Sequence, residues 1–306
     1  MDLRTYEALG LHRSLGDVDP TRVVNGRANR EIQGALSTPG DRQYHPNPEA
    51  FPDEATPHGR VVSHRGWAQS RVYPATTRDL WIYTPPGFDP AGPPPALMVF
   101  NDGGAYLDRA GPVRAAAVFD TLLAAGEMVP TVGVFVMPGQ AEGSPQQRSL
   151  EYDSLTDDYA RFLLEDLLPF VEREIGCRLS ADADRRTICG ISSGGICALT
   201  AAWRRPEAFG RVVSHCGSFT AIRGGHNYPF LIRSTPRKAI RVWMQSGSAD
   251  ADILYGSWPL ANQEVAAALA FAGYDMKFVF GEGGHNLRHG GALFADTLRW
   301  LWREGD

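Results

Sequence analysis

The sequence predicts an α/β protein in which helices flank a mainly parallel β-sheet. The chain contains a series of short, continuous apolar runs, which are typical of strands covered on both faces. Longer stretches with apolar residues at helical spacing lie between these runs. Strands that alternate with amphipathic helices form parallel sheets with helices on both faces, so this alternation determines the expected fold class.

The strands and helices are expected in a regular order along the chain. In residues 157–176, for example, Tyr159, Leu163 and Leu167 recur at helical spacing and share one face with Phe170 and Val171. The expected strands are residues 79–88, 96–104, 131–139, 185–190, 211–219, 241–248 and 276–285. The expected helices are residues 113–126, 157–176, 193–203, 262–274 and 292–302.

Residues 1–60 do not follow this alternation. Within them, residues 37–59 are rich in Pro, Asp and Gly, which favour turns and extended segments. We therefore expect residues 1–60 to form an irregular extension that packs on a core domain of residues 61–306. A chain of 306 residues is long enough for one large or two small domains, but it has no internal repeat, so one domain is the simplest interpretation.

Composition and charge exclude several classes of protein. The net charge of −5 without a basic run argues against nucleic-acid binding. No apolar stretch approaches the roughly 20 residues of a membrane span. The first 20 residues lack a basic start followed by an apolar core, so we expect no signal peptide and a cytoplasmic location. The oligomeric state stays open, and a homo-oligomer is one of the states that the sequence allows.

The four cysteines form no C-x-x-C pair, so the sequence predicts neither a zinc motif nor a redox motif. We interpret Cys177, Cys189, Cys197 and Cys216 as small buried apolar residues in a reduced protein. No metal or other cofactor is expected.

The strongest motif is the pattern G-x-S-x-G at Gly190–Gly194. A strand-like run precedes it and a helix-like stretch follows, which is the context of a nucleophilic serine on a tight strand-to-helix turn. Only Ser192 fits, because a motif centred on Ser193 would need glycine where Ile191 stands. The N–H of Ser193 would then point at the site where an oxyanion forms. The alternative is a glycine-rich turn with solvated serines.

A serine nucleophile needs a base, usually an imidazole. In an α/β-hydrolase the chain order is serine, then acid, then histidine, so the base should follow Ser192. His285 lies between the last expected strand and the last expected helix, and is the predicted base. His215 lies within a strand-like run and is expected in the core. His289 is four residues beyond His285, but Gly290 and Gly291 argue against a helix there, so a metal-binding pair is not expected.

The acid that orients the imidazole should follow the strand-like run at residues 241–248. Asp250 and Asp252 both qualify, and sequence alone barely separates them. Asp250 is preferred because it is closer to the strand end, with Glu264 a distant third. The second oxyanion donor should follow the run at residues 96–101, where the N–H of Gly104 is preferred.

Several segments together resemble one known family. They are residues 77–90, 96–106, 148–172, 190–210 and 281–302, within a similarity that spans about residues 61–302. This pattern resembles the putative-esterase family, which includes enterochelin-type siderophore esterases, feruloyl and acetyl-xylan esterases, S-formylglutathione hydrolases and mycolyltransferases. The spacing of Arg148 and Glu151 and the segment 166–169 look closest to the enterochelin-esterase branch. The resemblance implies an α/β-hydrolase fold with a triad of Ser192, Asp250 and His285.

The expected activity is hydrolysis of a small-molecule carboxylic ester through an acyl-enzyme. An acyltransferase with the same triad and a catalytically silent binding protein on the same fold are the alternatives. Arg148 either steers an anionic substrate or, as we favour, pairs with Glu151 or Asp153 to fix its loop. The residues that could shape the substrate pocket, besides Arg148, are Tyr106, His226, Tyr255 and Trp258.

Overall fold

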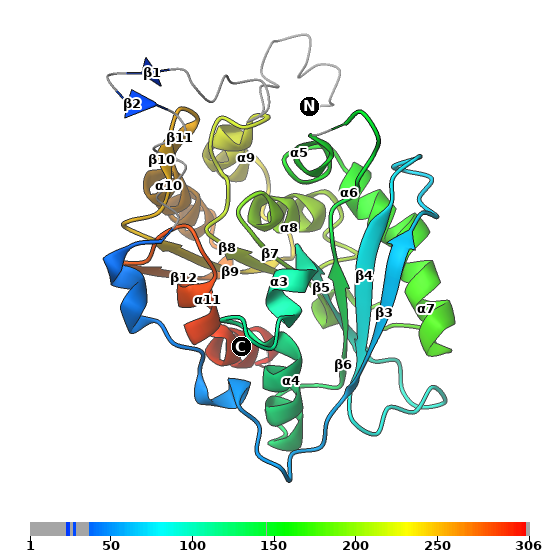
Figure 1. Cartoon of the computed structure of the whole chain (residues 1–306). Coiled ribbons are helices and arrows are strands. Elements are labelled where there is room, and N and C mark those ends of the chain that lie inside the picture. Colours follow the sequence, from blue (N-terminus) through cyan, green and yellow to red (C-terminus); the bar gives the residue numbers. More distant parts are fainter. Residues whose placement is uncertain (1–22, 25–26, 29–36, 145, 304–306) are drawn as a thin grey trace.

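An eight-stranded sheet organises the computed structural model, which describes residues 23–24, 27–28, 37–144 and 146–303 (Figure 1). The strand order is β12-β9-β8-β7-β5-β6-β4-β3. Neighbouring strands from β12 to β6 are parallel, whereas β4 pairs antiparallel with β6, and β3 with β4. The strands are β3 (Arg60–Trp67), β4 (Arg78–Thr84), β5 (Ala96–Asn101), β6 (Thr131–Val136), β7 (Arg186–Ile191), β8 (Arg211–His215), β9 (Arg241–Gly247) and β12 (Asp275–Gly281).

This architecture confirms the predicted α/β-hydrolase fold with a mainly parallel sheet. Strand β3 was not anticipated, because it lies at the sheet edge and its side chains are mostly exposed or half-buried. An edge strand of this kind lacks the continuous apolar run by which the buried strands were recognised. Two further antiparallel pairs are short: β1 (Val23–Val24) with β2 (Arg27–Ala28), and β10 (Asp252–Ile253) with β11 (Gly256–Ser257).

Helices cover both faces of the sheet and enclose two apolar layers. The layer on one face includes residues of α6, α7, α8, α9 and α10, and the layer on the other face includes residues of α3, α4 and α12. The α-helices are α3 (Gly103–Leu107), α4 (Ala115–Ala124), α5 (Gln147–Tyr152), α6 (Asp158–Arg161), α7 (Leu168–Ile175), α8 (Ser193–Arg204), α9 (Tyr228–Ser234), α10 (Trp258–Phe271), α11 (Arg288–Ala292) and α12 (Phe294–Trp302). The 3₁₀-helices are η2 (Pro39–Gln43), η3 (Pro48–Ala50), η5 (Ala183–Arg185) and η6 (Gly225–Asn227).

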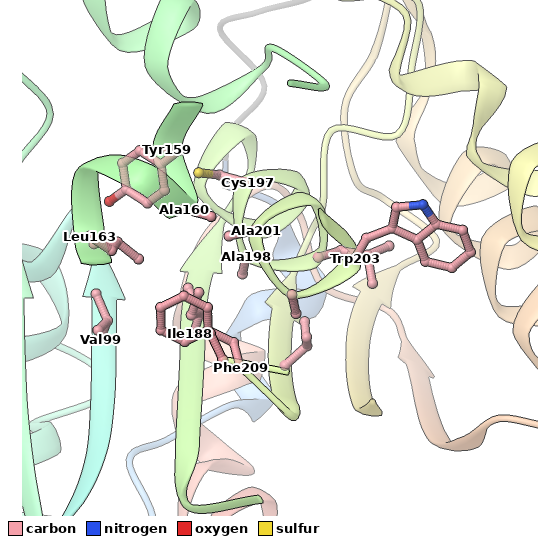
Figure 2. Close-up of a cluster of buried hydrophobic side chains, with 14 of the residues drawn as sticks. Val99, Tyr159, Ala160, Leu163, Ile188, Cys197, Ala198, Ala201, Trp203 and Phe209 are labelled. Carbon is pink, nitrogen blue, oxygen red and sulfur yellow. The ribbon is translucent and has the colours of Figure 1, made fainter. Parts of the chain in front are cut away.

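Helix α8 lies at the centre of the first layer (Figure 2). Ala198 and Ala201 on this helix belong to the same apolar cluster as Val99 of β5 and Ile188 of β7. Eleven of its twelve residues are buried, and Cys197 of this helix belongs to the same cluster as Tyr159 and Ala160 of α6. Packed apolar groups therefore hold the helix that begins beside Ser192.

The predicted helix at residues 157–176 is a compound one. It begins as α6, passes through a π-helical segment, η4 (Phe162–Leu167), and continues as α7. Pro169 has no N–H and so cannot bond to the carbonyl of Glu165, which instead accepts a hydrogen bond from Arg71. The irregular turn accommodates the proline without ending the helix.

The expected N-terminal extension is partly described. Residues 1–22, 25–26 and 29–36 lie outside the described residues. Beyond them, η2 and η3 lie on the core, and Ala50 is buried in the layer that contains α4 and α12. Among the described residues, no helix is both long and apolar enough to cross a membrane.

The strand order places a topological switch at β5. The chain leaves β5 to form β6 on one side, and later returns to form β7 on the other side. In open α/β sheets, ligands bind outside the carboxyl ends of the strands at such a switch. The loops that follow β5 and β7 are therefore the first place to look for a site.

Candidate active site

Ser192 occupies the sharp turn between β7 and α8, at the carboxyl end of the sheet. Its backbone is strained, with φ 60° and ψ −124°, which is rare for a residue with a side chain. The N–H of Ser192 donates to the carbonyl of His215 in the neighbouring strand at 2.9 Å. A side chain at Gly190 would collide with the backbone of Gly194, so the turn can close only around glycine.

His285 joins Ser192 to Asp250. Its Nε2 lies 2.8 Å from Ser192 Oγ, and its Nδ1 lies 2.5 Å from Asp250 Oδ1. The three residues follow β7, β9 and β12, so the parallel sheet brings them together from positions far apart in the sequence. A neutral imidazole with its proton on Nδ1 satisfies both contacts: it donates to the carboxylate and accepts from the serine hydroxyl.

The structure separates the two candidate acids. Asp250 is buried, and its carboxylate also accepts hydrogen bonds from Ser246 Oγ at 2.8 Å and from the N–H of Ala251 at 2.7 Å. Asp252 is exposed in the β10–β11 hairpin, and Glu264 is exposed on α10. Only Asp250 meets His285, because the turn after β9 directs its side chain inward.

Ser218 and Trp258 complete a chain of polar contacts around the serine. Ser218 Oγ lies 3.2 Å from Ser192 Oγ, and Trp258 Nε1 donates to Ser218 Oγ at 3.2 Å. The Trp258 ring also packs edge-on against His285, with ring centroids 5.7 Å apart. Because Ser218 accepts from the indole, its own proton is free to point at Ser192, whose hydroxyl then points at His285.

Two helix N-termini face the carboxyl edge of the sheet beside Ser192. The N–H of Ser193 belongs to the first turn of α8, and the N–H of Gly104 to the first turn of α3. The first N–H groups of a helix have no partner inside the helix, so they are available to a ligand oxygen. Asp102, the residue that precedes α3, has a left-handed backbone with φ 53°.

Arg148 pairs with an acid that the sequence did not suggest. Its guanidinium forms two hydrogen bonds with Asp102, at 3.0 and 2.7 Å, whereas Glu151 pairs with Arg78 in the core. The expected pairing with Glu151 or Asp153 was therefore wrong, because α5 turns Arg148 toward the turn after β5. Burial alone would lower the pKa of Arg148, but the hydrogen bonds to Asp102 raise it above its ordinary value.

Asp153 is a buried carboxyl group near the same loop. Burial raises its pKa above the ordinary value, while a hydrogen bond from Ser149 Oγ at 2.8 Å and the charge of Arg148 oppose this effect. Arg223, which has a left-handed backbone with φ 39°, also lowers the pKa of Asp153 through its charge.

Tyr106 does not line a pocket. Its side chain is fully buried in α3, and its hydroxyl lies 2.9 Å from Nδ1 of His215. His215 is buried in β8, as expected, and burial lowers its pKa to about 3. The expectation that Tyr106 could shape the pocket was wrong, because the short helix α3 turns this ring toward the sheet.

The other expected pocket residues lie between the end of β8 and the first residue of α10. Tyr255 is buried in a small apolar cluster with Ile222 and Trp258. His226 is exposed in η6, and its N–H donates to the carbonyl of Thr220. The Trp258 side chain contacts His285 directly.

The loop that carries His285 is held by the N-terminal segment. The N–H of Gly284 donates to Asp41 Oδ1 at 2.9 Å, and the N–H of Glu282 donates to the Tyr44 hydroxyl at 3.0 Å. The Tyr44 ring stacks on His289, with ring centroids 4.0 Å apart. Burial would raise the pKa of Asp41, but its hydrogen bonds from Thr38 and Gly284 lower it.

His289 itself lies in a helix, contrary to the expectation based on Gly290 and Gly291. These glycines serve close packing in α11, since a side chain at Gly290 would meet the ring of His215 at 2.8 Å. Nδ1 of His289 lies 3.0 Å from Nε2 of Gln245, so its imidazole is hydrogen-bonded within the core.

Sequence reasoning missed several residues of this site. Ser218 carried a usable signal, because it follows β8, the strand beside the one that ends at Ser192. Asp41 and Tyr44 carried none, since nothing in a Pro-rich segment indicates contact with a loop some 240 positions further on. Asp102 was not predicted, because Gly104 was taken to be the functional residue of this turn.

The fold places the chain in the α/β-hydrolase class. Two solved structures share the fold. A ferric enterobactin esterase from Salmonella typhimurium has a TM-score of 0.67 at 20% identity, over 94% of this chain and 76% of that chain. A ferulic acid esterase has a TM-score of 0.63 at 19% identity, over 80% of this chain and 98% of that chain.

The family model described as "Putative esterase" matches residues 73–300, and the chain belongs to this family, which confirms the resemblance. An iron(III) enterobactin esterase of Dickeya dadantii (strain 3937) is 28% identical over 239 residues, covering 73% of this chain and 51% of the relative. An iron(III) salmochelin esterase of Escherichia coli O6:H1 (strain CFT073) is 28% identical over 228 residues, covering 71% and 52%. The chain thus spans about half the length of the curated relatives it matches.

Proposed function

We propose that the chain is a serine hydrolase that cleaves small-molecule carboxylic esters through an acyl-enzyme. The observation that carries the proposal is the position of the His285 ring, within hydrogen-bond distance of both Ser192 Oγ and Asp250 Oδ1. The strained backbone of Ser192 supports it, because such strain persists mainly where it serves a function.

Each residue has a distinct role in the proposed reaction. His285 Nε2 takes the proton of Ser192 as Oγ attacks the ester carbonyl, and later returns it to the leaving alcohol. Asp250 holds the Nδ1 proton and stabilises the imidazolium that forms. Water, activated by the same nitrogen, then attacks the acyl-enzyme and releases the acid.

The N–H groups of Ser193 and Gly104 are the proposed donors to the oxyanion. Both belong to helix N-termini, whose positive dipole ends favour the developing negative charge. Loss of one such donor typically costs about a hundredfold to a thousandfold in rate.

The names of the relatives indicate the substrate class in broad terms. Curated relatives are named as esterases of iron(III) enterobactin and iron(III) salmochelin, and one structural neighbour as a ferulic acid esterase. We propose an enterochelin esterase-like activity. A panel of acetyl, feruloyl and catecholate-siderophore esters identifies the acyl group, and an added acceptor alcohol distinguishes hydrolysis from acyl transfer.

The adjacent serines provide the decisive test. Ser192→Ala should lower kcat for a p-nitrophenyl ester by a factor on the order of 10⁶, with the protein still folded. Ser193→Ala is the matched control: it keeps the backbone N–H and should retain most of the rate. Unchanged turnover in Ser192→Ala, or loss of turnover in Ser193→Ala alone, would contradict the proposed mechanism.

A further inference from the structure

Cys216 lies directly behind the proposed acid and base. It follows β8 with a left-handed backbone, φ 47°, and its side chain is fully buried with a free thiol. Its Sγ lies 3.8 Å from Gln245 Oε1, 3.8 Å from the carbonyl of Gly284 and 3.9 Å from that of Asn286. Two of these carbonyls flank His285, so the thiol sits beneath the loop that carries the base.

The thiol belongs to a cluster of three side chains of the types that bind metal ions. One ligand atom from each of Cys216, Asp250 and His285 lies within 4.8 Å of the other two. Within the described ranges, no other group of His, Cys, Asp or Glu side chains meets this condition. The proposed reaction uses Asp250 and His285, but it has no use for a thiol.

We propose that Cys216, Asp250 and His285 form a binding site for zinc that inhibits the enzyme. Thiolate, imidazole and carboxylate are the three donor types that zinc prefers, and three protein ligands leave its fourth position to water. The charges also balance, because zinc adds two positive charges, and the thiolate and the carboxylate each supply one negative charge. A neutral complex avoids the large cost of an unpaired buried charge.

The protons balance as well. A thiol ordinarily carries its proton at neutral pH, and a metal binds the thiolate. Zinc binding releases this one proton to solvent. The proton that His285 carries on Nδ1 moves to Nε2, because Nδ1, the nitrogen that faces Asp250, becomes the metal ligand.

Inhibition follows from the position of the imidazole proton of His285, which lies on Nε2 when zinc is bound. With zinc on Nδ1, Nε2 carries a hydrogen and donates to Ser192 Oγ, which lies 2.8 Å away. The imidazole then cannot accept the proton of Ser192. Asp250, now a metal ligand, also ceases to stabilise the imidazolium. This inhibitory effect rests on the proposed function, whereas metal binding itself does not.

Of the three side chains, that of His285 is the one that reaches solvent. It is 14% exposed, whereas those of Asp250 and Cys216 are fully buried. We therefore expect zinc to reach the cluster past the His285 ring, when the imidazole swings off Asp250. A hard cation such as Mg²⁺ prefers oxygen ligands in an octahedral arrangement and has no reason to bind here.

The experiment compares variants of two cysteines in the full chain. Hydrolysis of a p-nitrophenyl ester is measured against ZnCl₂ in a non-chelating buffer, each variant relative to its own metal-free rate. Co²⁺ provides a readout that needs no activity, because a bond to thiolate gives a charge-transfer absorption band. Cys216→Ala and Cys216→Ser remove the ligand, and Cys177→Ser, which replaces a half-buried thiol elsewhere, is the matched control.

We expect zinc to inhibit the unmodified protein and Cys177→Ser alike, EDTA to restore both, and MgCl₂ to have no effect. Both Cys216 variants should need at least about tenfold more zinc and should lose the Co²⁺ band. Unchanged zinc sensitivity or an unchanged band in the Cys216 variants would overturn the proposal. If hydrolysis is absent but the band forms, the metal site stands and the proposed function fails. If hydrolysis proceeds without zinc inhibition or band, only the metal site fails.

Discussion

The turn that carries Ser192 and the loop that carries His285 are built in different ways. The serine turn is made by its own neighbours: Gly190 and Gly194 allow it to close, and adjacent strands hold it through the bond from the Ser192 N–H to the His215 carbonyl. The histidine loop depends on Asp41 and Tyr44, side chains from a segment some 240 positions earlier.

This difference shows why one half of the site carries a motif and the other does not. A turn that can close only because of its own glycines leaves a pattern in the sequence. For a loop held by distant side chains, the sequence shows the position of the histidine. It does not show which side chains fix the orientation of the loop.

After the loss of Ser192 itself, a change at Asp250 should cause the largest fall in kcat. Asp250→Asn keeps the size of the side chain but removes the charge that selects the Nδ1–H tautomer of His285, so kcat should fall about 10⁴-fold. Asp252→Asn, in the exposed hairpin, is the control and should leave the rate unchanged. Steady-state kinetics on the same ester measures both, and equal losses in the two variants would remove Asp250 from the triad.

The sequence predicted the parts of the molecule that depend on local patterns. Apolar runs predict the buried strands. Ser192 is predicted because it is the one position in its segment that fits the G-x-S-x-G motif. The choice between Asp250 and Asp252 stayed open because both follow β9, and only the direction of the turn separates them.

The errors arose where packing decides the outcome. Gly290 and Gly291 were interpreted as helix breakers, but they let α11 approach His215 and the chain at Pro112. Tyr106 was expected to shape the substrate pocket, but its side chain is fully buried and its hydroxyl contacts His215. Neither the pairing of Arg148 with Asp102 nor the contact between Ser218 and Ser192 has a fixed sequence spacing that could reveal it.

His215 lies between the two regions and should make both sensitive to acid. Its carbonyl holds the serine turn, and its ring packs against Gly290 of α11. The folded pKa of about 3 lies below the ordinary 6.5, so the unfolded chain binds more protons between these values. Stability should therefore be complete above pH 6.5 and fall toward pH 3, by up to about 1.4 kcal/mol per pH unit.

Denaturant unfolding between pH 7 and pH 4 tests this expectation. His215→Gln should flatten the acid limb of the stability curve, whereas His226→Gln, which changes an exposed histidine, should not. An acid limb of equal slope in His215→Gln would show that other groups cause it.

Asp41 should have a smaller effect, confined to the histidine loop. Asp41→Asn replaces charge-assisted hydrogen bonds to Gly284 and Thr38, each worth about 1.5–3 kcal/mol, with weaker neutral ones. We expect kcat to fall about tenfold with KM unchanged, because the ring of His285 is less well oriented while the substrate pocket is intact. Asp53→Asn, an exposed acid of the same segment, is the control. A rise in KM with constant kcat would mean that Asp41 does not position His285.

The smallest expected effect tests whether the two regions act as one hydrogen-bond chain. Ser218→Ala removes the hydroxyl beside Ser192, and Trp258→Phe removes the N–H that orients this hydroxyl while keeping an aromatic ring against His285. Each change should lower kcat about fivefold, the equivalent of one hydrogen bond of about 1 kcal/mol. If Trp258 acts through Ser218, the double variant should be no slower than Ser218→Ala alone, since there is then no hydroxyl left to orient. Multiplicative losses, about 25-fold in the double variant, would mean that the tryptophan acts on His285 by packing, and that the serine turn and the histidine loop are coupled through the triad contacts alone.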